Sequence, residues 1–454
     1  MISSTVAAIS TPAGEGGISV IRISGDDAIN IADKCFFAFS GKPLSALSGY
    51  SAAYGQIKTN DGSVIDDGVA LLFRAPKSYT GEDTVEISVH GGNAASRAVL
   101  RRILECGARL AEGGEFTKRA FLNGKLDLSE AESVMGVITA RSDAALKLSR
   151  AGKNGTISRR TEELREKLLH TAACFAAYSD FPDEDIPDLE PAQFISLLNE
   201  CQDELTKMLK NFDAGKIIRE GIDCAIVGKP NVGKSTLMNL LSKAEKSIVT
   251  DIAGTTRDIV ENTVNLGDII LNLADTAGIR DTADKVEKIG VERAVERTRT
   301  AGIILAVFDS SSPLSPDDLT LLQEIKGKPS VVILNKTDLG AILSEKDFDG
   351  FKVVSLSAKS GDGEEELIKA ITETVGLNKL SPDDTVLITE RQRECAERAL
   401  KSVTEALSAY QAGITLDAVG VLVDSAVEAL LELTGKRVTN EVAAEVFKRF
   451  CIGK

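Results

Sequence analysis

Hydrophobic and polar residues follow three different patterns along the chain, and the first pattern covers residues 1–120. Short apolar runs in this part predict strands at Thr5–Ile9, Ile18–Ile23, Ala53–Ile57, Val69–Phe73 and Thr84–Val89. Apolar residues at helical spacing predict helices at Ala28–Phe37 and Ala94–Cys106. These elements indicate a compact α+β domain.

The second pattern begins near Phe121, where Ala, Leu, Glu and Lys recur at helical spacing as far as Lys210. An acidic stretch with prolines, Asp180–Pro187, interrupts it; its carboxylates lack the spacing of a calcium loop, which favours a solvated connection. A strand-rich stretch, the third pattern, then occupies roughly 218–375. After Pro382, helices return from Glu390 to Phe450 with a turn near Gly413.

These patterns predict a multidomain protein. We expect an α+β N-terminal domain at 1–120, a helical domain formed by 121–215 and 379–454, and an α/β domain at 216–378 inserted into the helical domain. Insertion is plausible because the two ends of a compact domain lie close together.

One glycine-rich stretch, Gly228–Ser235, has the sequence of a phosphate-binding P-loop. It follows the apolar run Ile222–Val227 and precedes the helix-like run Thr236–Leu241. In such a loop the backbone N–H groups surround phosphate oxygens, Lys234 reaches the β- and γ-phosphates, and the Ser235 hydroxyl binds Mg²⁺. A chance match to a glycine-rich turn is the alternative for this motif alone.

Four further fragments follow in the order expected of a GTPase. Asp275-Thr-Ala-Gly278 and Asn335-Lys-Thr-Asp338 each come after a buried-strand pattern, and Asp338 is suited to accept both donors on the guanine edge. Ser357-Ala-Lys359 supplies backbone donors, and Thr256 offers a hydroxyl that completes the Mg²⁺ shell when the γ-phosphate is present. The predicted GTP-binding residues are Asn231, Val232, Gly233, Lys234, Ser235, Thr236, Thr250, Asp251, Ile252, Ala253, Gly254, Thr255, Thr256, Asp275, Thr276, Ala277, Gly278, Asn335, Lys336, Asp338, Ser357, Ala358 and Lys359.

The position after Gly278 is Ile279, where Ras-like enzymes place the glutamine that orients the attacking water. Arg280 and Glu287 lie just downstream, in a charged segment that is equally consistent with an ordinary helix start. Asn231 offers a neutral oxygen ligand beside the phosphates, which suits a large monovalent cation. A role in shaping the turn explains Asn231 equally well.

Composition narrows the setting of these motifs. The 454 residues are 43% hydrophobic and 27% charged, with a net charge of −15, so any RNA contact requires a local basic patch or a partner. Seven scattered cysteines without a C-x-x-C motif indicate a reducing compartment, the cytoplasm. The longest apolar runs are too short to span a membrane, so stable membrane insertion is not expected.

Three features of the N-terminal part are typical of a site as well as of ordinary structure. They are Arg22 in an apolar strand, the stretch Ser78–Asp83, and His90 before two glycines. An ion-paired strand arginine, a turn and a strand end account for them at least as well from composition alone.

Taken together, these motifs resemble the MnmE (TrmE) family of tRNA modification GTPases, along the whole chain. Thr11–Gly25 and Ser78–Asp83 look like the family's folate-binding domain, Gly113–Leu128 looks like the join to its helical domain, and Cys451-Ile-Gly-Lys454 matches its C-terminal motif.

The resemblance implies modification of the tRNA wobble uridine (uridine-34) at carbon 5, giving carboxymethylaminomethyl or aminomethyl groups. It also implies a one-carbon unit from tetrahydrofolate (the 5-formyl or 5,10-methylene derivative), GTP hydrolysis, and a dimerising N-terminal domain. The implied partners are a second copy in a homodimer, tRNA, and the FAD protein MnmG (GidA) in a heterotetramer or larger complex.

The resemblance also implies roles for single residues. Arg22, Glu82, Lys125 and Lys454 contact the folate; Ser235 and Thr256 bind Mg²⁺; and Asn231, Thr250, Ile252 and Thr255 bind K⁺. Glu287 orients the attacking water with Arg280 nearby, and K⁺-dependent pairing of two GTPase domains activates hydrolysis. Cys451 is a further site candidate, although a structural thiol explains it equally well.

Two other classes share parts of this pattern. A regulatory GTPase in ribosome assembly has the same P-loop but usually carries a basic RNA-binding appendage. A membrane-remodelling GTPase requires a basic or apolar tip, which this sequence lacks.

Overall fold

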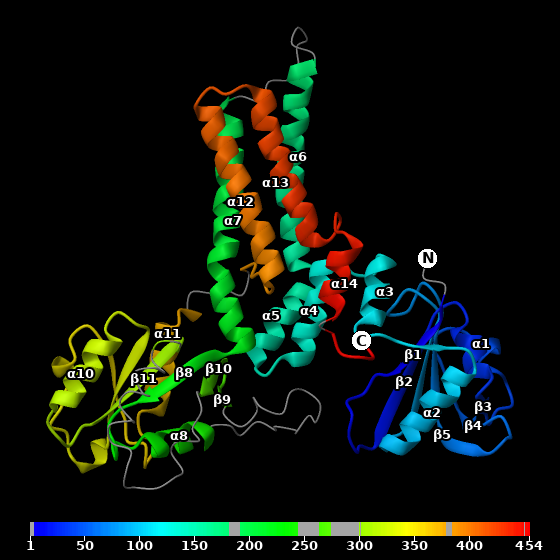
Figure 1. Cartoon of the computed structure of the whole chain (residues 1–454), viewed down its shortest axis with the longest axis horizontal. Helices are drawn as coiled ribbons and strands as arrows, with labels where there is room; N and C mark the ends of the chain where they lie inside the picture. The colour runs from blue at the N-terminus through cyan, green and yellow to red at the C-terminus, as the bar shows by residue number, and fades with distance from the viewer. Residues whose placement is uncertain are drawn as a thin grey trace.

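The computed structural model describes residues 4–180, 191–243, 263–273, 299, 301–377, 384–448 and 450–454. A bundle of long helices stands between the N-terminal sheet domain and an α/β domain that is inserted into the helical domain (Figure 1). The chain is therefore multidomain with the predicted fold classes. Among the described residues, no helix combines the length and apolar character needed to cross a membrane.

The N-terminal domain is built on a seven-stranded sheet in the order β3-β4-β5-β6-β2-β1-β7, antiparallel except where β1 pairs with β7. Helices α1 and α2 cover one face, on which Ile21 and Ile23 are buried, so Arg22 lies on the opposite face. The elements are β1 Val6–Ile9, β2 Ile18–Ser24, α1 Ala28–Asp33, β3 Phe36–Ala38, η1 Leu44–Ala46, β4 Ser51–Lys58, β5 Val64–Phe73, β6 Thr84–His90, α2 Asn93–Glu105 and β7 Arg109–Leu110.

One element of this domain differs from its prediction. The expected helix Ala28–Phe37 ends at Asp33, and Phe36–Ala38 forms strand β3. Phe36 pairs with Ile57 of β4 and is buried, while Phe37 faces outward. Pairing with β4 and the strand preference of aromatic residues outweigh the helical spacing of the preceding residues.

The helical domain draws its core from both ends of the chain. Leu168 of α6 and Phe212 of α7 belong to the same buried cluster as Cys395 of α12 and Leu430 of α13. The helices are α3 Glu115–Leu122, α4 Leu128–Thr139, α5 Asp143–Lys153, α6 Thr156–Asp180, α7 Pro191–Glu220, α12 Glu390–Gln411, α13 Leu416–Thr434 and α14 Asn440–Lys448.

A buried ion pair joins the two sequence halves of this domain. Arg391, at the start of α12, pairs with Glu132 of α4 at 2.7 Å and also donates to the carbonyls of Glu432 and Leu433 at the end of α13. Removing either charged partner leaves the other largely buried without an opposite charge, which is strongly destabilising. The segment that leaves the inserted domain is thereby held against the bundle.

The inserted domain has a six-stranded sheet in the order β13-β12-β11-β8-β10-β9, parallel except where β10 pairs with β9. Apolar clusters lie on both faces, which explains the nearly continuous apolar runs of its strands. Its elements are β8 Ile222–Val227, α8 Lys234–Lys243, β9 Thr263–Leu266, β10 Ile269–Leu273, β11 Ile303–Asp309, α10 Pro316–Ile325, β12 Ser330–Asn335, η3 Thr337–Leu339, η4 Glu345–Asp347, β13 Lys352–Ser355 and α11 Glu364–Thr374.

The C-terminal residues return to the N-terminal domain (Figure 1). Phe447 of α14 packs against Leu128 of α4, and the N–H of Phe116 then donates to the carbonyl of Lys454 at 3.1 Å. Gly453 has φ +94°, and a Cβ there would lie 2.3 Å from the carbonyl oxygen of Ile9. Only glycine fits this close approach to β1.

Candidate functional site

The predicted P-loop connects the end of β8 to the start of α8, as its sequence requires. The Lys234 ammonium donates to the carbonyls of Gly228 and Lys229 at 2.8 and 2.6 Å, so the lysine lies across its own loop. Burial lowers the pKa of Lys234, because no carboxylate of the described residues offsets the loss of hydration. An incoming phosphate would supply that missing negative charge.

Asn335 connects the P-loop to the predicted base-recognition segments. Its side chain is buried; Nδ2 donates to the carbonyl of Val232 at 2.8 Å, and Oδ1 accepts from the N–H of Ala358 at 3.0 Å. Gly233 has φ +99°, and a Cβ there would lie 2.2 Å from Asn335 Nδ2. The three segments therefore meet at the carboxyl ends of β8, β12 and β13, the edge at which open α/β sheets bind ligands.

The other residues of the Asn335 segment are held by neighbouring strand ends. Asp338 accepts from the Ser357 hydroxyl at 3.0 Å, which orients the exposed carboxylate. Lys336 has φ +66° and pairs with Asp309, at the end of β11, at 2.6 Å. Burial opposes ionisation of Asp309, but hydrogen bonds from Lys336 and Ser311 lower its pKa overall. Because Lys336 pairs with Asp309, Asp338 keeps an exposed carboxylate that can accept from a ligand.

Some of the remaining predicted nucleotide-site residues lie in the described part of the chain, and the others lie outside it. Asn231 with φ +64°, Ser235, Thr236 and Lys359 are exposed around the same sheet edge. The other predicted residues, which lie outside the described part of the chain, are Thr250, Asp251, Ile252, Ala253, Gly254, Thr255, Thr256, Asp275, Thr276, Ala277, Gly278, Arg280 and Glu287.

A second group of predicted residues meets on the N-terminal sheet. Arg22 of β2 and Glu86 of β6 are direct cross-strand partners, joined by Nε–Oε1 at 2.8 Å. The half-buried Lys454 lies close enough that burial and the charge of Arg22 lower its pKa. Two cationic side chains distant in sequence, Arg22 and Lys454, therefore lie near the Glu86 carboxylate.

Aromatic rings flank this site. The Arg22 guanidinium lies 5.4 Å from the ring centres of Tyr79 and Phe116. Tyr79 also lines a hollow of ≈330 Å³ together with Tyr50, Phe73, Lys77, Ser78 and Lys125. Lys125 donates to the carbonyl of Pro76 at 3.1 Å at the exposed side of this hollow. Tyr79 therefore lies beside both Arg22 and Lys125.

Glu82 faces a different neighbour. Both of its carboxylate oxygens accept from Arg119 Nη1 at 3.0 Å, and one also accepts from the Ser24 hydroxyl. Arg119 is fully buried and pairs in addition with Glu115. These contacts give Glu82 a structural part in joining α3 to the sheet. The predicted candidate Cys451 is exposed, and its carbonyl accepts from the N–H of Gly114.

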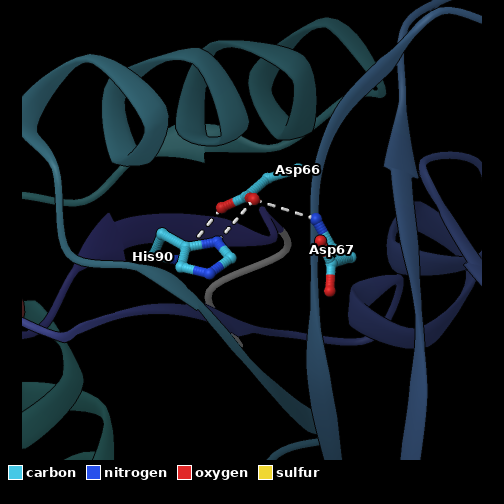
Figure 2. A group of neighbouring side chains, drawn as sticks. All are labelled: Asp66, Asp67 and His90. Carbon is cyan, nitrogen blue, oxygen red and sulfur yellow. Dashed lines mark hydrogen bonds and ion pairs between the residues drawn. The ribbon is translucent and has the colours of Figure 1, made fainter.

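Asp66, Asp67 and His90 are the one group of three metal-ligating residue types found close together in the described part of the chain (Figure 2). His90 Nδ1 lies 2.7 Å from Asp66, whose carboxylate also accepts from the N–H groups of Asp67 and His90. Tyr54 donates to Asp67 at 2.5 Å. Each carboxylate thus has a donor within the chain, and the group is a satisfied ion pair at the end of β6.

Several residues of both sites escaped prediction. Asp309 and Glu86 lie outside every predicted motif, whereas Tyr79 and Arg119 lie within Ser78–Asp83 and Gly113–Leu128 but were not predicted as site residues. Each acts through a partner distant in sequence. The outward position of Glu86 on a strand was the one available signal, because polar residues on an outer face invite cross-strand pairing. Its partner depends on the register between β2 and β6.

Comparisons with known proteins agree with these features. Residues 128–451 match a family model described as the MnmE helical domain, and residues 5–125 match one described as the GTP-binding protein TrmE N-terminus. A solved G-domain of FeoB from Methanococcus jannaschii is 28% identical, and the match covers 34% of this chain and 98% of that one with a TM-score of 0.26.

Curated relatives extend the likeness to the whole chain. A tRNA modification GTPase MnmE of Clostridioides difficile (strain 630) is 40% identical over 458 residues, covering 100% of both chains. One of the same name from Lysinibacillus sphaericus (strain C3-41) is 42% identical over 461 residues and covers 99% of each. The chain therefore belongs to the MnmE (TrmE) family of tRNA modification GTPases.

Proposed function

We propose that this chain is the GTP-hydrolysing subunit of a complex that modifies the wobble uridine of tRNA with a one-carbon unit from tetrahydrofolate. The observation that carries the GTPase part is the Asn335 junction. It joins the phosphate loop to the segments that would hold guanine, at distances of 2.8 and 3.0 Å. The match of residues 5–125 to the TrmE N-terminus favours tRNA modification over a role in ribosome assembly.

The described residues of the proposed nucleotide site each have a physical role in binding. Lys234 exchanges its two loop carbonyls for β- and γ-phosphate oxygens, and the N–H groups at the start of α8 face the phosphates. Asp338 accepts from the guanine N1 and N2 donors, which adenine does not offer. The exposed Ser235 hydroxyl fits a Mg²⁺ ligand, with Thr256 as the second. Bound Mg²⁺ neutralises charge that develops on the phosphates.

Hydrolysis in this proposal depends on residues beyond the described part. Glu287 orients the attacking water through a second water, with Arg280 nearby, because Ile279 cannot do so. Asn231, Thr250, Ile252 and Thr255 hold K⁺, whose charge acts where an arginine finger acts in other GTPases. Pairing of two GTPase domains completes this arrangement, so hydrolysis requires K⁺ and dimerisation.

The folate part of the proposal is supported by the N-terminal site. Arg22 and Lys454 present positive charge to an anionic ligand, while Tyr79 offers an aromatic face for a flat ring. Lys125 adds a third cation at the neighbouring hollow. In this proposal Glu82 contributes by holding α3 in place through Arg119.

We also propose the assembly in which this subunit works. The sheet face that carries Arg22 exposes Ile18, Val69 and Tyr54 (67, 37 and 56% exposed), which supports pairing of two N-terminal domains in a homodimer. The FAD protein MnmG and tRNA complete the proposed complex, which works in the cytoplasm. FAD would enter only with MnmG.

The experiment that tests this function measures GTP turnover by the purified chain in matched KCl and NaCl buffers. Light scattering in GDP plus aluminium fluoride follows the oligomeric state in parallel. Stimulation by K⁺ together with tighter association supports the proposed mechanism. Slow turnover that is indifferent to the cation would contradict it and leave a generic GTPase.

A further inference from the structure

The phosphate loop contacts helix α10 as well as Asn335. Lys229, the residue after Gly228, extends its side chain to the first turn of α10, where its ammonium pairs with the Asp318 carboxylate at 2.5 Å. Asp318 is buried, and the Lys229 side chain is partly buried. The contact therefore joins the loop that follows β8 to the helix that follows β11.

Asp318 is held in place by the start of its own helix. Ser315 and Asp318 form a capping box, in which the carboxylate accepts from the N–H and the hydroxyl of Ser315 at 2.9 and 3.0 Å. The N–H of Asp318 donates in return to the Ser315 hydroxyl oxygen at 3.4 Å. The oxygen that accepts these bonds, Oδ2, is also the one that pairs with Lys229. Asp318 thus presents a fixed negative charge to the loop.

The backbone of Lys229 contacts the lysine that is predicted to bind phosphate. Its carbonyl accepts from the Lys234 ammonium at 2.6 Å, beside the Gly228 carbonyl at 2.8 Å. Lys229 is therefore bonded at both ends, by its side chain to Asp318 and by its carbonyl to Lys234. The position of Lys234 depends on Asp318 through this one residue.

Neither the loop motif nor helix capping accounts for this ion pair. The P-loop motif prescribes two glycines, a lysine and a serine or threonine, and it leaves the residue at position 229 open. The capping box is complete without Lys229, because Ser315 supplies both of its bonds to the carboxylate. Removing the lysine charge would leave the buried Asp318 carboxylate without an opposite charge, which makes this pair more consequential than an exposed one.

We propose that Asp318 is a positioning residue of the GTPase site, which acts through Lys229 to fix the start of the phosphate loop in the shape that binds phosphate. A loop that is already ordered loses less conformational freedom when a nucleotide binds. The pair orders the loop for GDP and GTP alike, so it strengthens nucleotide binding and leaves the chemical step unchanged. The proposal rests on the proposed binding of guanine nucleotides at this loop.

The first test is Lys229→Met in the full-length chain, which keeps most of the apolar stem and removes the ammonium. We expect the affinity for a fluorescent GDP analogue (mant-GDP) to fall roughly 5- to 20-fold. The KM for GTP should rise by a similar factor while kcat stays within about twofold, because the lost interaction is uniform. Lys229→Arg keeps a cation that can pair with the carboxylate, and it should restore affinity to within about threefold of the wild type.

The second test is Asp318→Asn, which keeps an acceptor for Ser315 and removes the charge that holds Lys229. It should lose as much GDP affinity as Lys229→Met, and the double variant should lose no more than either single variant, because the two residues act as a pair. Additive losses in the double variant would contradict this.

Two control variants separate positioning from general damage to the domain. Ser315→Ala removes the hydroxyl of the cap but keeps the N–H that bonds Asp318, and Lys352→Met breaks an exposed pair with Glu373 at the edge strand β13. Both should bind mant-GDP within about twofold of the wild type. A loss in Ser315→Ala equal to that in Asp318→Asn would show that Asp318 acts only by capping α10, and would overturn the proposal.

The same titration distinguishes failure of this proposal from failure of the nucleotide assignment. Wild-type affinity in Lys229→Met would overturn the positioning role alone. Absence of mant-GDP binding by the wild type would overturn the positioning role together with the nucleotide assignment.

Discussion

The nucleotide edge of the inserted domain and the Arg22 site of the N-terminal domain are assembled in opposite ways. At the nucleotide edge, short contiguous segments already sit at neighbouring strand ends, and one buried side chain, Asn335, holds them together. At the Arg22 site, a strand residue meets Lys454, the last residue of the chain. The first site depends on a local fold, whereas the second requires the helical domain to deliver the chain end.

This difference indicates which parts of the fold each site depends on. A parallel sheet brings the carboxyl ends of its strands to one edge whatever happens elsewhere, so the nucleotide edge depends on its own domain. The Arg22 site depends in addition on α14 and on the path of Gly453 past Ile9. Changes at one site should therefore leave the other nearly intact.

The largest expected effect concerns Arg22. Arg22→Ala removes the central cation and leaves Lys454 to pair with Glu86, so we expect reduced-folate affinity to fall at least ~100-fold, beyond detection by calorimetry. GTP turnover should stay within about twofold, because the sites belong to separate domains. The control is Arg97→Ala, an exposed arginine on α2. Unchanged folate affinity in Arg22→Ala would refute the site assignment.

The reciprocal change is Asn335→Ala. It leaves the Val232 carbonyl and the Ala358 N–H without their partner, so we expect GDP affinity to fall roughly 10²- to 10³-fold, measured by fluorescence titration. Folate binding should not change. Asn272→Ala is the matched control, since its amide bonds Glu220 at the other end of the same sheet. An equal loss of GDP affinity in Asn335→Ala and Asn272→Ala would contradict a role of Asn335 in the nucleotide site.

Two glycine substitutions test whether the contact between the phosphate loop and Asn335 matters for nucleotide binding. Gly233→Ala and Gly267→Ala both place a side chain at positive φ, +99° and +76°, so both should lose roughly 1 kcal/mol of stability. Only at position 233 does the new Cβ meet Asn335, whereas position 267 has nothing within 4 Å. We therefore expect a further ~10-fold loss of GDP affinity in Gly233→Ala alone. Equal GDP affinities in the two variants would show that the phosphate loop accommodates the new methyl group at position 233 without any effect on nucleotide binding.

The smallest effect is expected from His90, which tests whether the N-terminal domain responds to pH. The hydrogen bond that protonated His90 donates to Asp66 raises the pKa of His90. The stabilising contribution of this pair is therefore full below the ordinary value of 6.5 and is lost as pH rises through the raised value. Because His90 is exposed, the melting-temperature difference between wild type and His90→Gln should shrink by only ~1 °C between about pH 6 and about pH 8. A difference that grows with pH would contradict this sign.

Much of the fold was predictable because the strands of the inserted domain are buried on both faces. The apolar run Ile222–Val227 coincides with β8, and the buried-strand pattern before Asn335 corresponds to β12. Prediction was wrong at Phe36–Ala38, where pairing with β4 decided the conformation. The two-residue strand β7 has too little sequence to show a pattern. The conformation of a short edge element depends more on the strand with which it pairs than on its own sequence.

The same distinction between local sequence and distant contacts applies to the candidate sites. Gly228–Ser235, Asn335–Asp338 and Ser357–Lys359 were found from sequence because each motif is contiguous and lies at a strand end. The structural use of Glu82 was not, since its partner Arg119 lies on a helix well beyond the sheet in sequence. Distant partners leave no local pattern to recognise.

The sequence by itself determined the segments predicted to bind phosphate and base, because their chemistry requires particular residues at fixed short spacings and the adjoining strand or helix places them. Tertiary structure alone decided that Arg22 lies beside Glu86 and Lys454. Such contacts depend on strand register and helix packing, and a shift of one residue would turn Arg22 to the other face of the sheet.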